Sequence, residues 1–475
     1  MYRNQKDEQA LLRRTTRQSR SIAALMPIMA AVLIGFLIIG VALPILPLHV
    51  HQGLGLSAFV VGLVTGSQFG TSLISRILAG HYADRRGAKR AVVAGLVTAT
   101  ASGLLYLLSL FFVAAPWLSV TILLVGRAVL GAAESFIITG AVSWGLALVG
   151  RENAGRVIAW IGMAMFAALA FGAPLGTSLY AIGGFAAVAA ATALLPLLTL
   201  LLVAPLSTVP PQRGVRPALL KAARAVWMPG FGSALSSIGF GAIITFGSLL
   251  SAQRGWSPLW LVFSSFAVSL VVARLLFGHL PDRLGGARVA LLCVFIQAAG
   301  LALIWLASGR ALATAGAVLT GFGYSLVYPG LGVEAVRRSP SESRGLAMGA
   351  YTVFLDVALG FGCPALGLLA AQAGLGSVFF ACTLIVLGTA PIALRLLPVK
   401  AKNGCHVNKD GDNNAPRHRE ALVRQVGETK SQTCRGNYQR RHDHTELRRG
   451  VGFGGHGRDR AEGLDREGLQ AGHSW

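Results

Sequence analysis

One short turn occurs twice in this sequence, each time between two long apolar segments. Residues 76–90 read RILAGHYADRRGAKR and residues 274–288 read RLLFGHLPDRLGGAR, so eight positions are identical at a constant offset of 198. The identical pairs are Arg76/Arg274, Leu78/Leu276, Gly80/Gly278, His81/His279, Asp84/Asp282, Arg85/Arg283, Gly87/Gly285 and Arg90/Arg288. A repeat of such long period within hydrophobic sequence indicates a duplicated bundle of membrane helices.

The composition agrees with a membrane protein. Hydrophobic residues make up 54% of the chain and charged residues only 13%, whereas an ordinary soluble domain contains about 25% charged residues. The formal net charge of +23 would suit a nucleic-acid-binding protein. However, the basic residues before position 398 lie almost entirely in short connections between apolar runs. We therefore expect no nucleic-acid partner.

Twelve apolar stretches can be placed along the chain, most of them close to the ~20 residues that cross a bilayer as a helix. They are residues 22–46, 57–82, 91–113, 117–148, 157–181, 184–205, 226–251, 257–280, 288–308, 311–333, 345–371 and 376–397. Helices are expected because lipid offers no hydrogen-bond partners to an open backbone. The first stretch lacks the small-residue cleavage site of a signal peptide, so it is expected to be retained. The predicted fold class is an all-α membrane protein with twelve transmembrane helices.

The domain organisation and orientation follow from the connections. Alternate connections hold 22 Lys and Arg residues on one side of the membrane, against Arg254 and Arg310 on the other, which predicts that both termini are cytoplasmic. Anionic lipid headgroups would attract these loops. The predicted parts are a cytoplasmic N-terminal segment (1–21), a six-helix bundle (22–205), a cytoplasmic linker (206–225), a second six-helix bundle (226–397) and a tail (398–475).

The tail is polar and has no apolar periodicity, so it is expected to be disordered and to take no part in the function of the membrane domain. Its two cysteines, Cys405 and Cys434, are 29 residues apart and form no Cys-x-x-Cys pair. We therefore expect neither a metal site nor a cofactor.

The first copy of the repeated turn has a specific motif, Gly80-x-x-x-Asp84-Arg85-x-Gly87-x-Lys89-Arg90, and the second copy retains Gly278, Asp282 and Arg283. Gly80 permits close helix contact, Gly87 permits a turn conformation that a side chain disfavours, and Asp84 can meet a helix N-terminus or an arginine. Arg85, Lys89 and Arg90 would face the headgroups. In this context the chain resembles the major facilitator superfamily from about residue 22 to 397. That resemblance implies a cytoplasmic latch between two bundles, formed when a transporter opens outward. Alternatively, the motif fixes only topology and a tight turn.

Three further stretches sharpen the resemblance. Gly126-Arg127 in the fourth apolar stretch is similar to an arginine motif of the family, and Gly172-Ala173-Pro174-Leu175-Gly176 is similar to a motif associated with exporters. Gly362 and Pro364 repeat the Gly172 and Pro174 pattern at an offset of 190. Small residues beside a proline predict a bendable helix, although glycines used only for packing would look the same. Leu43–Pro47 and Tyr351–Asp356 resemble a bacterial branch described as arabinose-efflux-like.

Charged residues within the apolar stretches are the candidates for mechanism, because each is costly inside a membrane. Asp356 and Arg127 lie near mid-depth of their stretches, and Glu134 follows Arg127 by two helical turns. We expect Asp356 first, and Glu134 second, to take and release a proton, and Arg127 to find a partner on another helix. The alternative is that paired or neutral carboxylates only orient helices. Arg76 and Arg274 are expected to snorkel or to support the gate. His49, His51, His81 and His279 are expected to be solvated interface side chains.

The function that these features predict is secondary active transport of a small solute, with proton-coupled export of a sugar or drug-like molecule as the leading mode. The resemblance implies a monomer in the bacterial inner membrane. Uptake, facilitated diffusion and a membrane sensor remain alternatives. An ATP-driven pump is disfavoured because the sequence has no Gly-x-x-x-x-Gly-Lys-Ser/Thr loop, and no enzyme motif occurs in a suitable context.

Overall fold

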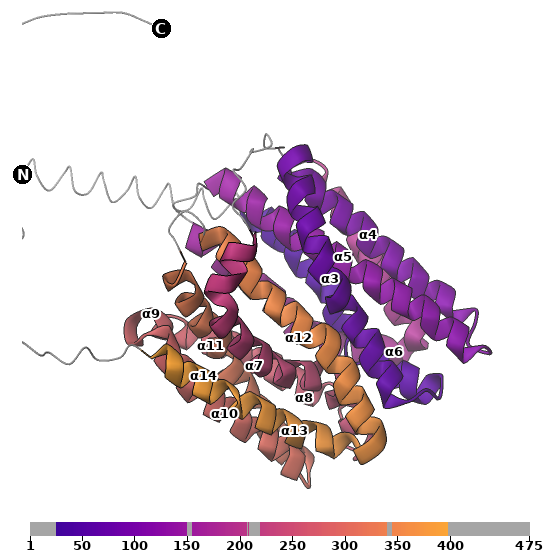
Figure 1. The fold of residues 1–475 in the computed structure, drawn as a ribbon. Coiled ribbons are helices and arrows are strands. Elements are labelled where there is room, and N and C mark those ends of the chain that lie inside the picture. The colour runs from indigo at the N-terminus through magenta and orange to yellow at the C-terminus, as the bar shows by residue number, and fades with distance from the viewer. Residues whose placement is uncertain (1–24, 150–153, 207, 209–218, 340–343, 398–475) are drawn as a thin grey trace, which may run out of the picture. The chain divides into compact units, whose positions relative to one another are not determined.

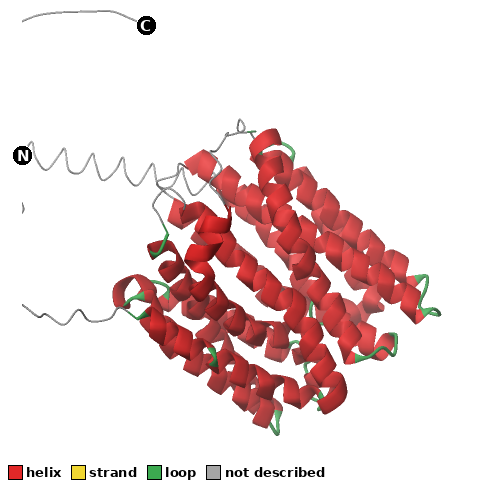
Figure 2. Cartoon of the chain, in the orientation of Figure 1, coloured by secondary structure: helices red, strands yellow, loops and turns green. Residues whose placement is uncertain are grey.

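A computed structural model describes residues 25–149, 154–206, 208, 219–339 and 344–397. The predicted N-terminal segment 1–21, most of the linker 206–225 and the tail 398–475 therefore lie outside the described residues. Helices account for nearly all of the described chain, and Figure 2 draws no strand in it. The all-α prediction is confirmed.

The N-terminal half begins with a helix over residues 25–42, which α2 (Leu46–Leu48) and the π-helix η1 (His49–Gly53) continue as one apolar segment. The helices that follow are α3 (Ala58–Arg86), α4 (Ala88–Leu110), α5 (Pro116–Val149) and α6 (Ala154–Val203). Gly183 and Gly184 have non-helical backbone angles within α6. Two crossings therefore meet at this point, where the sequence predicts a break.

The C-terminal half begins after the linker. Its helices are α7 (Leu219–Gln253), α8 (Leu261–Phe277), α9 (Leu280–Leu284), α10 (Gly286–Leu306), α11 (Arg310–Arg337), α12 (Arg344–Ala373), α13 (Leu375–Leu387) and α14 (Thr389–Leu396). The short helices α9 and α14 extend the crossings that α8 and α13 begin. Neither is a crossing by itself, because α9 has 5 residues and α14 has 8, whereas about 20 are needed to span a bilayer.

Ten segments of the described chain are long and apolar enough to cross a membrane. One of them, Trp160–Val203, contains the break at Gly183 and Gly184 and so supplies two crossings, and the shorter apolar helix Leu261–Phe277 supplies another. Within the described residues the prediction of twelve transmembrane helices is thereby confirmed.

The helices form two groups that follow the halves of the sequence (Figure 1). In the first half α4 packs against α5 and α6, and in the second half α10 packs against α11 and α13. Between the groups, α3 packs against α12 and α6 packs against α8. In the sequence repeat α3 corresponds to α8, and the first part of α6 corresponds to α12. The contact of α3 with α12 is therefore equivalent to the contact of α8 with α6. The packing therefore has the symmetry that the repeated turn indicates.

The two groups come closest at one end of α3, where glycines let backbone meet backbone. A Cβ atom on Gly62 would collide with the carbonyl oxygen of Cys363, and one on Gly367 would lie 2.5 Å from the carbonyl oxygen of Ala58. On the symmetry-related contact, Ser264 Oγ donates to the Ala170 carbonyl at 3.3 Å. The loop charges predict that this end of α3 faces outward. In this conformation the closed end is thus the predicted outer end.

Candidate functional site

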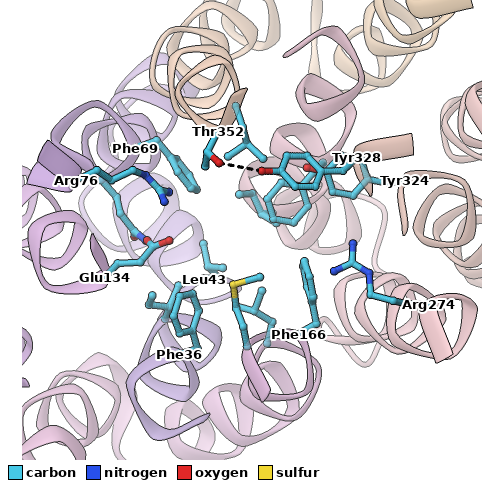
Figure 3. Close-up of a pocket in the computed structure, with 17 residues that line it drawn as sticks. Phe36, Leu43, Phe69, Arg76, Glu134, Phe166, Arg274, Tyr324, Tyr328 and Thr352 are labelled. Carbon is cyan, nitrogen blue, oxygen red and sulfur yellow. Dashed lines mark hydrogen bonds between the residues drawn. The ribbon is translucent and has the colours of Figure 1, made fainter. Parts of the chain in front are cut away.

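A central cavity lies between the two groups of helices and is lined from both (Figure 3). Its volume is about 170 Å³, which is below the ~300–1,000 Å³ of typical small-molecule sites. Its lining consists of Phe36, Ile39, Leu43, Gln68, Phe69, Arg76, Glu134, Met165, Phe166, Leu169, Phe240, Ile244, Arg274, Tyr324, Tyr328, Thr352 and Leu355. Most of these side chains are apolar or aromatic, and three are charged. Such a surface suits a small amphipathic molecule.

An ion pair joins the two helix groups beside this cavity. Arg76 Nε of α3 lies 2.5 Å from Asp356 Oδ2 of α12, and Arg76 Nη2 lies 3.0 Å from Asp356 Oδ1. The Asp356 side chain is only 1% exposed, and that of Arg76 is 22% exposed. A buried bidentate pair of this kind strongly fixes the geometry of both side chains. The expectation that Arg76 snorkels is wrong, because a carboxylate from the opposite group of helices holds it inside.

Glu134 lies on the same side of the cavity as Arg76 (Figure 3). Gln68 Nε2 donates to Glu134 Oε2 at 2.7 Å, so the carboxylate is buried with one polar partner from α3. Arg127, two turns earlier on α5, is fully buried away from the cavity lining. Its three guanidinium nitrogens have no hydrogen-bond partner among the described residues. The partner that we expected for Arg127 on another helix is therefore not present in this conformation.

Arg274, the repeat equivalent of Arg76, also lines the cavity instead of snorkelling. Its guanidinium carbon lies 4.8 Å from the centre of the Phe166 ring, and its Nη2 donates to the Ser325 carbonyl at 3.2 Å. Figure 3 places Arg274 across the cavity from Arg76 and Glu134. Two arginines, one from each half, therefore face one space from opposite sides.

The repeated turn has the backbone that its glycines allow. Gly87 has φ 96° and Gly285 has φ 95°, both in the left-handed region that favours glycine. Asp84 is exposed and forms no hydrogen bond or ion pair with the rest of the described chain. A Cβ on Gly80 would meet no heavy atom within 4 Å. The close contact that we expected at Gly80 is thus not made here, since the two groups of helices touch at the opposite end of α3.

The basic residues of the motif differ in their surroundings. Lys89 Nζ donates to the carbonyls of Ala204 and Leu206, at 2.7 Å in each case, and so holds the end of α6. Arg85, Arg90, Asp282 and Arg283 are exposed, and Gly278 lies against the Arg274 carbonyl.

Glycines of the exporter-like motif serve close packing in this conformation. A Cβ on Gly172 would lie 2.6 Å from the carbonyl carbon of Gly40, and one on Gly176 would collide with the Val41 carbonyl oxygen. Pro174 lies inside α6 and Pro364 inside α12. A Cβ on Gly362 would lie 3.5 Å from the Ile238 side chain, which is an ordinary contact distance. Bending of these helices remains a prediction.

His49 departs from the expectation of a solvated histidine. It is buried and stacks on Phe185, with ring centroids 4.0 Å apart and an interplanar angle of 4°. The π-helical turn η1 directs this side chain inward, a feature that the sequence did not suggest. His51 is exposed, with Nδ1 2.7 Å from the Leu56 carbonyl.

Comparison with known proteins decides the family. The family model of the Major Facilitator Superfamily matches residues 28–262 and 229–426. The chain belongs to this superfamily. A major facilitator superfamily protein is a membrane transporter of small molecules and not an enzyme, which agrees with a central cavity lined by both groups of helices.

Relatives and solved structures agree with the superfamily. An uncharacterized MFS-type transporter of Salmonella typhimurium is 42% identical over 382 residues, which cover 80% of this chain and 98% of the relative. The uncharacterized MFS-type transporter YhhS of Escherichia coli is 40% identical over 362 residues, covering 76% and 88% respectively. None of these relatives singles out an arabinose-efflux-like branch.

Two solved structures share the fold. The nucleoside transporter NupG has a TM-score of 0.65 at 14% identity, covering 79% of this chain and all of that structure. A bacterial homologue of the human lysosomal transporter Spinster, in an inward-facing and unoccupied conformation, has a TM-score of 0.59 at 14% identity, covering 79% and 96%.

Proposed function

We propose that this transporter exports a small solute, such as a sugar or drug-like molecule, across the bacterial inner membrane in exchange for protons. The observation that carries the proposal is the ion pair between Arg76 and Asp356, which connects the two halves beside the central cavity. Alternating access requires the halves to rock against each other around a central site. A contact across the halves that depends on charge is a point at which a proton can control this movement.

The chemistry of the pair supplies the coupling step. A proton on Asp356 removes the negative charge and one hydrogen-bond acceptor, which weakens the bidentate contact with Arg76. Arg76 would then be a buried cation without its partner, a costly state in a low-dielectric site. Glu134 lies on the same side of the cavity and offers a second carboxylate to Arg76 (Figure 3). Proton uptake at Asp356 is therefore expected to release α3 from α12 and favour the alternative conformation.

One sequence feature supports the direction of transport, and one structural feature supports the latch. The motif that contains Pro174 is similar to one associated with exporters, and this similarity favours export. Asp84 has no hydrogen-bond partner among the described residues while the halves touch at the predicted outer end, the arrangement expected of a latch that forms only after outward opening, whichever way the solute moves.

Transport by purified protein in liposomes tests the proposal. Vesicles with an acidic lumen are supplied with a panel of radiolabelled sugars and drug-like compounds. Antiport predicts that one of these solutes accumulates above its external concentration, and that a protonophore abolishes the accumulation. Accumulation only with the opposite gradient would show uptake by symport. Equilibration that ignores the gradient would show facilitated diffusion, and binding without movement would favour a sensor.

Asp84→Asn and, separately, Gly80→Leu are expected to reduce transport at least about 10-fold, because a charge-assisted contact contributes roughly 1.5–3 kcal/mol and a bulky side chain obstructs latch closure. Neither change should prevent insertion, since Asp84 is exposed and Gly80 faces open space in this conformation. Initial transport rates are compared at equal membrane abundance. Normal transport by the Asp84→Asn protein would contradict a latch role for the motif.

A further inference from the structure

We infer that the central cavity binds an organic anion, a carboxylate or phosphate on an apolar body, and that Arg274 is the residue that recognises it. The inference rests on the proposed function only in taking this cavity as the transport site. It adds the chemical class of the solute and the side chain that selects it.

Two contacts that are equivalent under the sequence repeat differ in the chemistry of one partner. Arg76 and Arg274 correspond at the offset of 198, and α6 corresponds to α12 at the offset of 190, so that Phe166 occupies the position equivalent to Asp356. In the structure Arg76 pairs with Asp356, and Arg274 lies over the ring of Phe166. The same arginine-to-helix contact is thus made twice. The partner of the arginine is a carboxylate in one contact and an uncharged ring in the other.

The replacement of the carboxylate by a ring leaves a positive charge in the cavity. A guanidinium stays protonated in proteins, so Arg274 carries its positive charge permanently. Its described polar contact is the Ser325 carbonyl, and its buried Nε has no hydrogen-bond partner. No carboxylate of the described residues forms an ion pair with it, and Glu134 lies across the cavity (Figure 3). An anion entering from solvent would therefore find a cation that no acidic side chain of the described residues neutralises.

The surroundings of Arg274 are aromatic and aliphatic. Phe166 covers one face of the guanidinium, while Phe240, Ile244 and Leu169 contribute apolar wall to the same cavity. A planar guanidinium recognises carboxylate and phosphate oxygens through paired hydrogen bonds, and weak hydration makes it suited to a dry site. Aromatic and aliphatic walls favour an apolar body on the same solute. A hydrophilic inorganic ion would gain nothing from these walls, whereas an aromatic acid fits both features.

Ligands of matched shape and different charge test the inference. The purified full-length protein is heated in detergent with benzoate or phenyl phosphate as anions, benzamide as the neutral analogue and benzylammonium as the cation. A ligand that binds the native state raises the unfolding midpoint. We expect the anions to raise it in a saturable manner and the neutral and cationic analogues to have no comparable effect. Equal shifts from benzoate and benzamide, or no shift with either anion, would overturn the inference.

Substitutions at the site identify the responsible cation. Arg274→Gln is expected to weaken anion binding about 10- to 100-fold, the range of a lost charge-assisted contact. Arg288→Gln, an exposed arginine on α10 outside the cavity, is the matched control and should bind as the natural protein does. Undiminished benzoate binding by the Arg274→Gln protein would assign recognition to another group.

Phe166 provides a test that does not remove Arg274. Phe166→Asp recreates the contact that Arg76 makes with Asp356, so an internal carboxylate should compete with the ligand and abolish anion binding. Phe166→Asn removes the same ring without adding charge and should retain the preference for benzoate over benzamide. Loss in both variants would show that the ring, and not the charge of Arg274, matters.

The outcome is independent of proton coupling, because binding in detergent involves no gradient. If anion binding depends on Arg274 while vesicles show no proton-driven transport, the export mechanism fails and the solute class stands. If vesicles concentrate a neutral solute on a pH gradient and the protein ignores both anions, the solute class fails alone.

Discussion

Asp356→Asn is expected to abolish accumulation driven by a pH gradient while leaving solute binding and counterflow intact. Asparagine keeps the size of the side chain and resembles the protonated acid, so the halves can still rock. It cannot exchange a proton, so the gradient no longer drives the cycle. One pH unit corresponds to about 1.36 kcal/mol, or about 10-fold in concentration. In a one-for-one exchange the variant should lose roughly this factor of accumulation for each pH unit imposed.

The control for this measurement is a buried carboxylate outside the cavity. Glu334 of α11 is 7% exposed and lies 3.4 Å from Arg337 Nη1. Glu334→Gln should retain gradient-driven accumulation when rates are compared per folded protein. Glu134→Gln provides the second candidate. If the Asp356→Asn protein still concentrates solute, Asp356 only orients helices and Glu134 is tested next. If both variants do so, neither carboxylate couples transport to protons.

The fold was predictable because its signals are long and redundant. Apolar stretches of bilayer length specify the crossings, and the repeated turn specifies two equivalent halves. Even the break within α6 was located, because two glycines and the end of an apolar run coincide at Gly183 and Gly184. The backbone conformation of the repeated turn was also predictable, because glycine is the residue that readily adopts a positive φ, as Gly87 and Gly285 do.

The partners within the site could not be predicted in the same way. Depth along the sequence correctly marked Asp356 as a buried charge, but its contact with Arg76 spans 280 residues and depends on how α3 and α12 rotate against each other. Arg76 was expected to snorkel because it lies near the end of its apolar stretch, 57–82. The sequence did hold one unused signal. Aligning the halves at their two offsets sets Arg76 with Arg274 and Phe166 with Asp356, so a contact between Arg76 and Asp356 has an equivalent between Arg274 and Phe166.

Gly62→Leu is expected to abolish transport, by about 100-fold or more, with the protein still folded in the membrane. In the closed outer end a Cβ at this position collides with the Cys363 carbonyl. Backbone of two packed helices cannot yield as a flexible side chain does, so α3 and α12 must separate. Leucine is a better helix former than glycine, so α3 itself is not weakened. The expected defect is therefore confined to the contact between the halves.

Gly70→Leu is the matched control, since it places the same side chain two turns further along α3, where a Cβ meets no heavy atom within 4 Å. This protein should transport at a rate within a few-fold of the natural one. Thiol labelling from the predicted outer side, with a single cysteine at Ala58, reports the conformation directly. Gly62→Leu should make this cysteine more reactive, and Gly70→Leu should leave its reactivity unchanged. If Gly62→Leu transports normally, the close contact at the outer end is not part of the cycle, because no conformation with the two backbones in contact can accommodate the leucine.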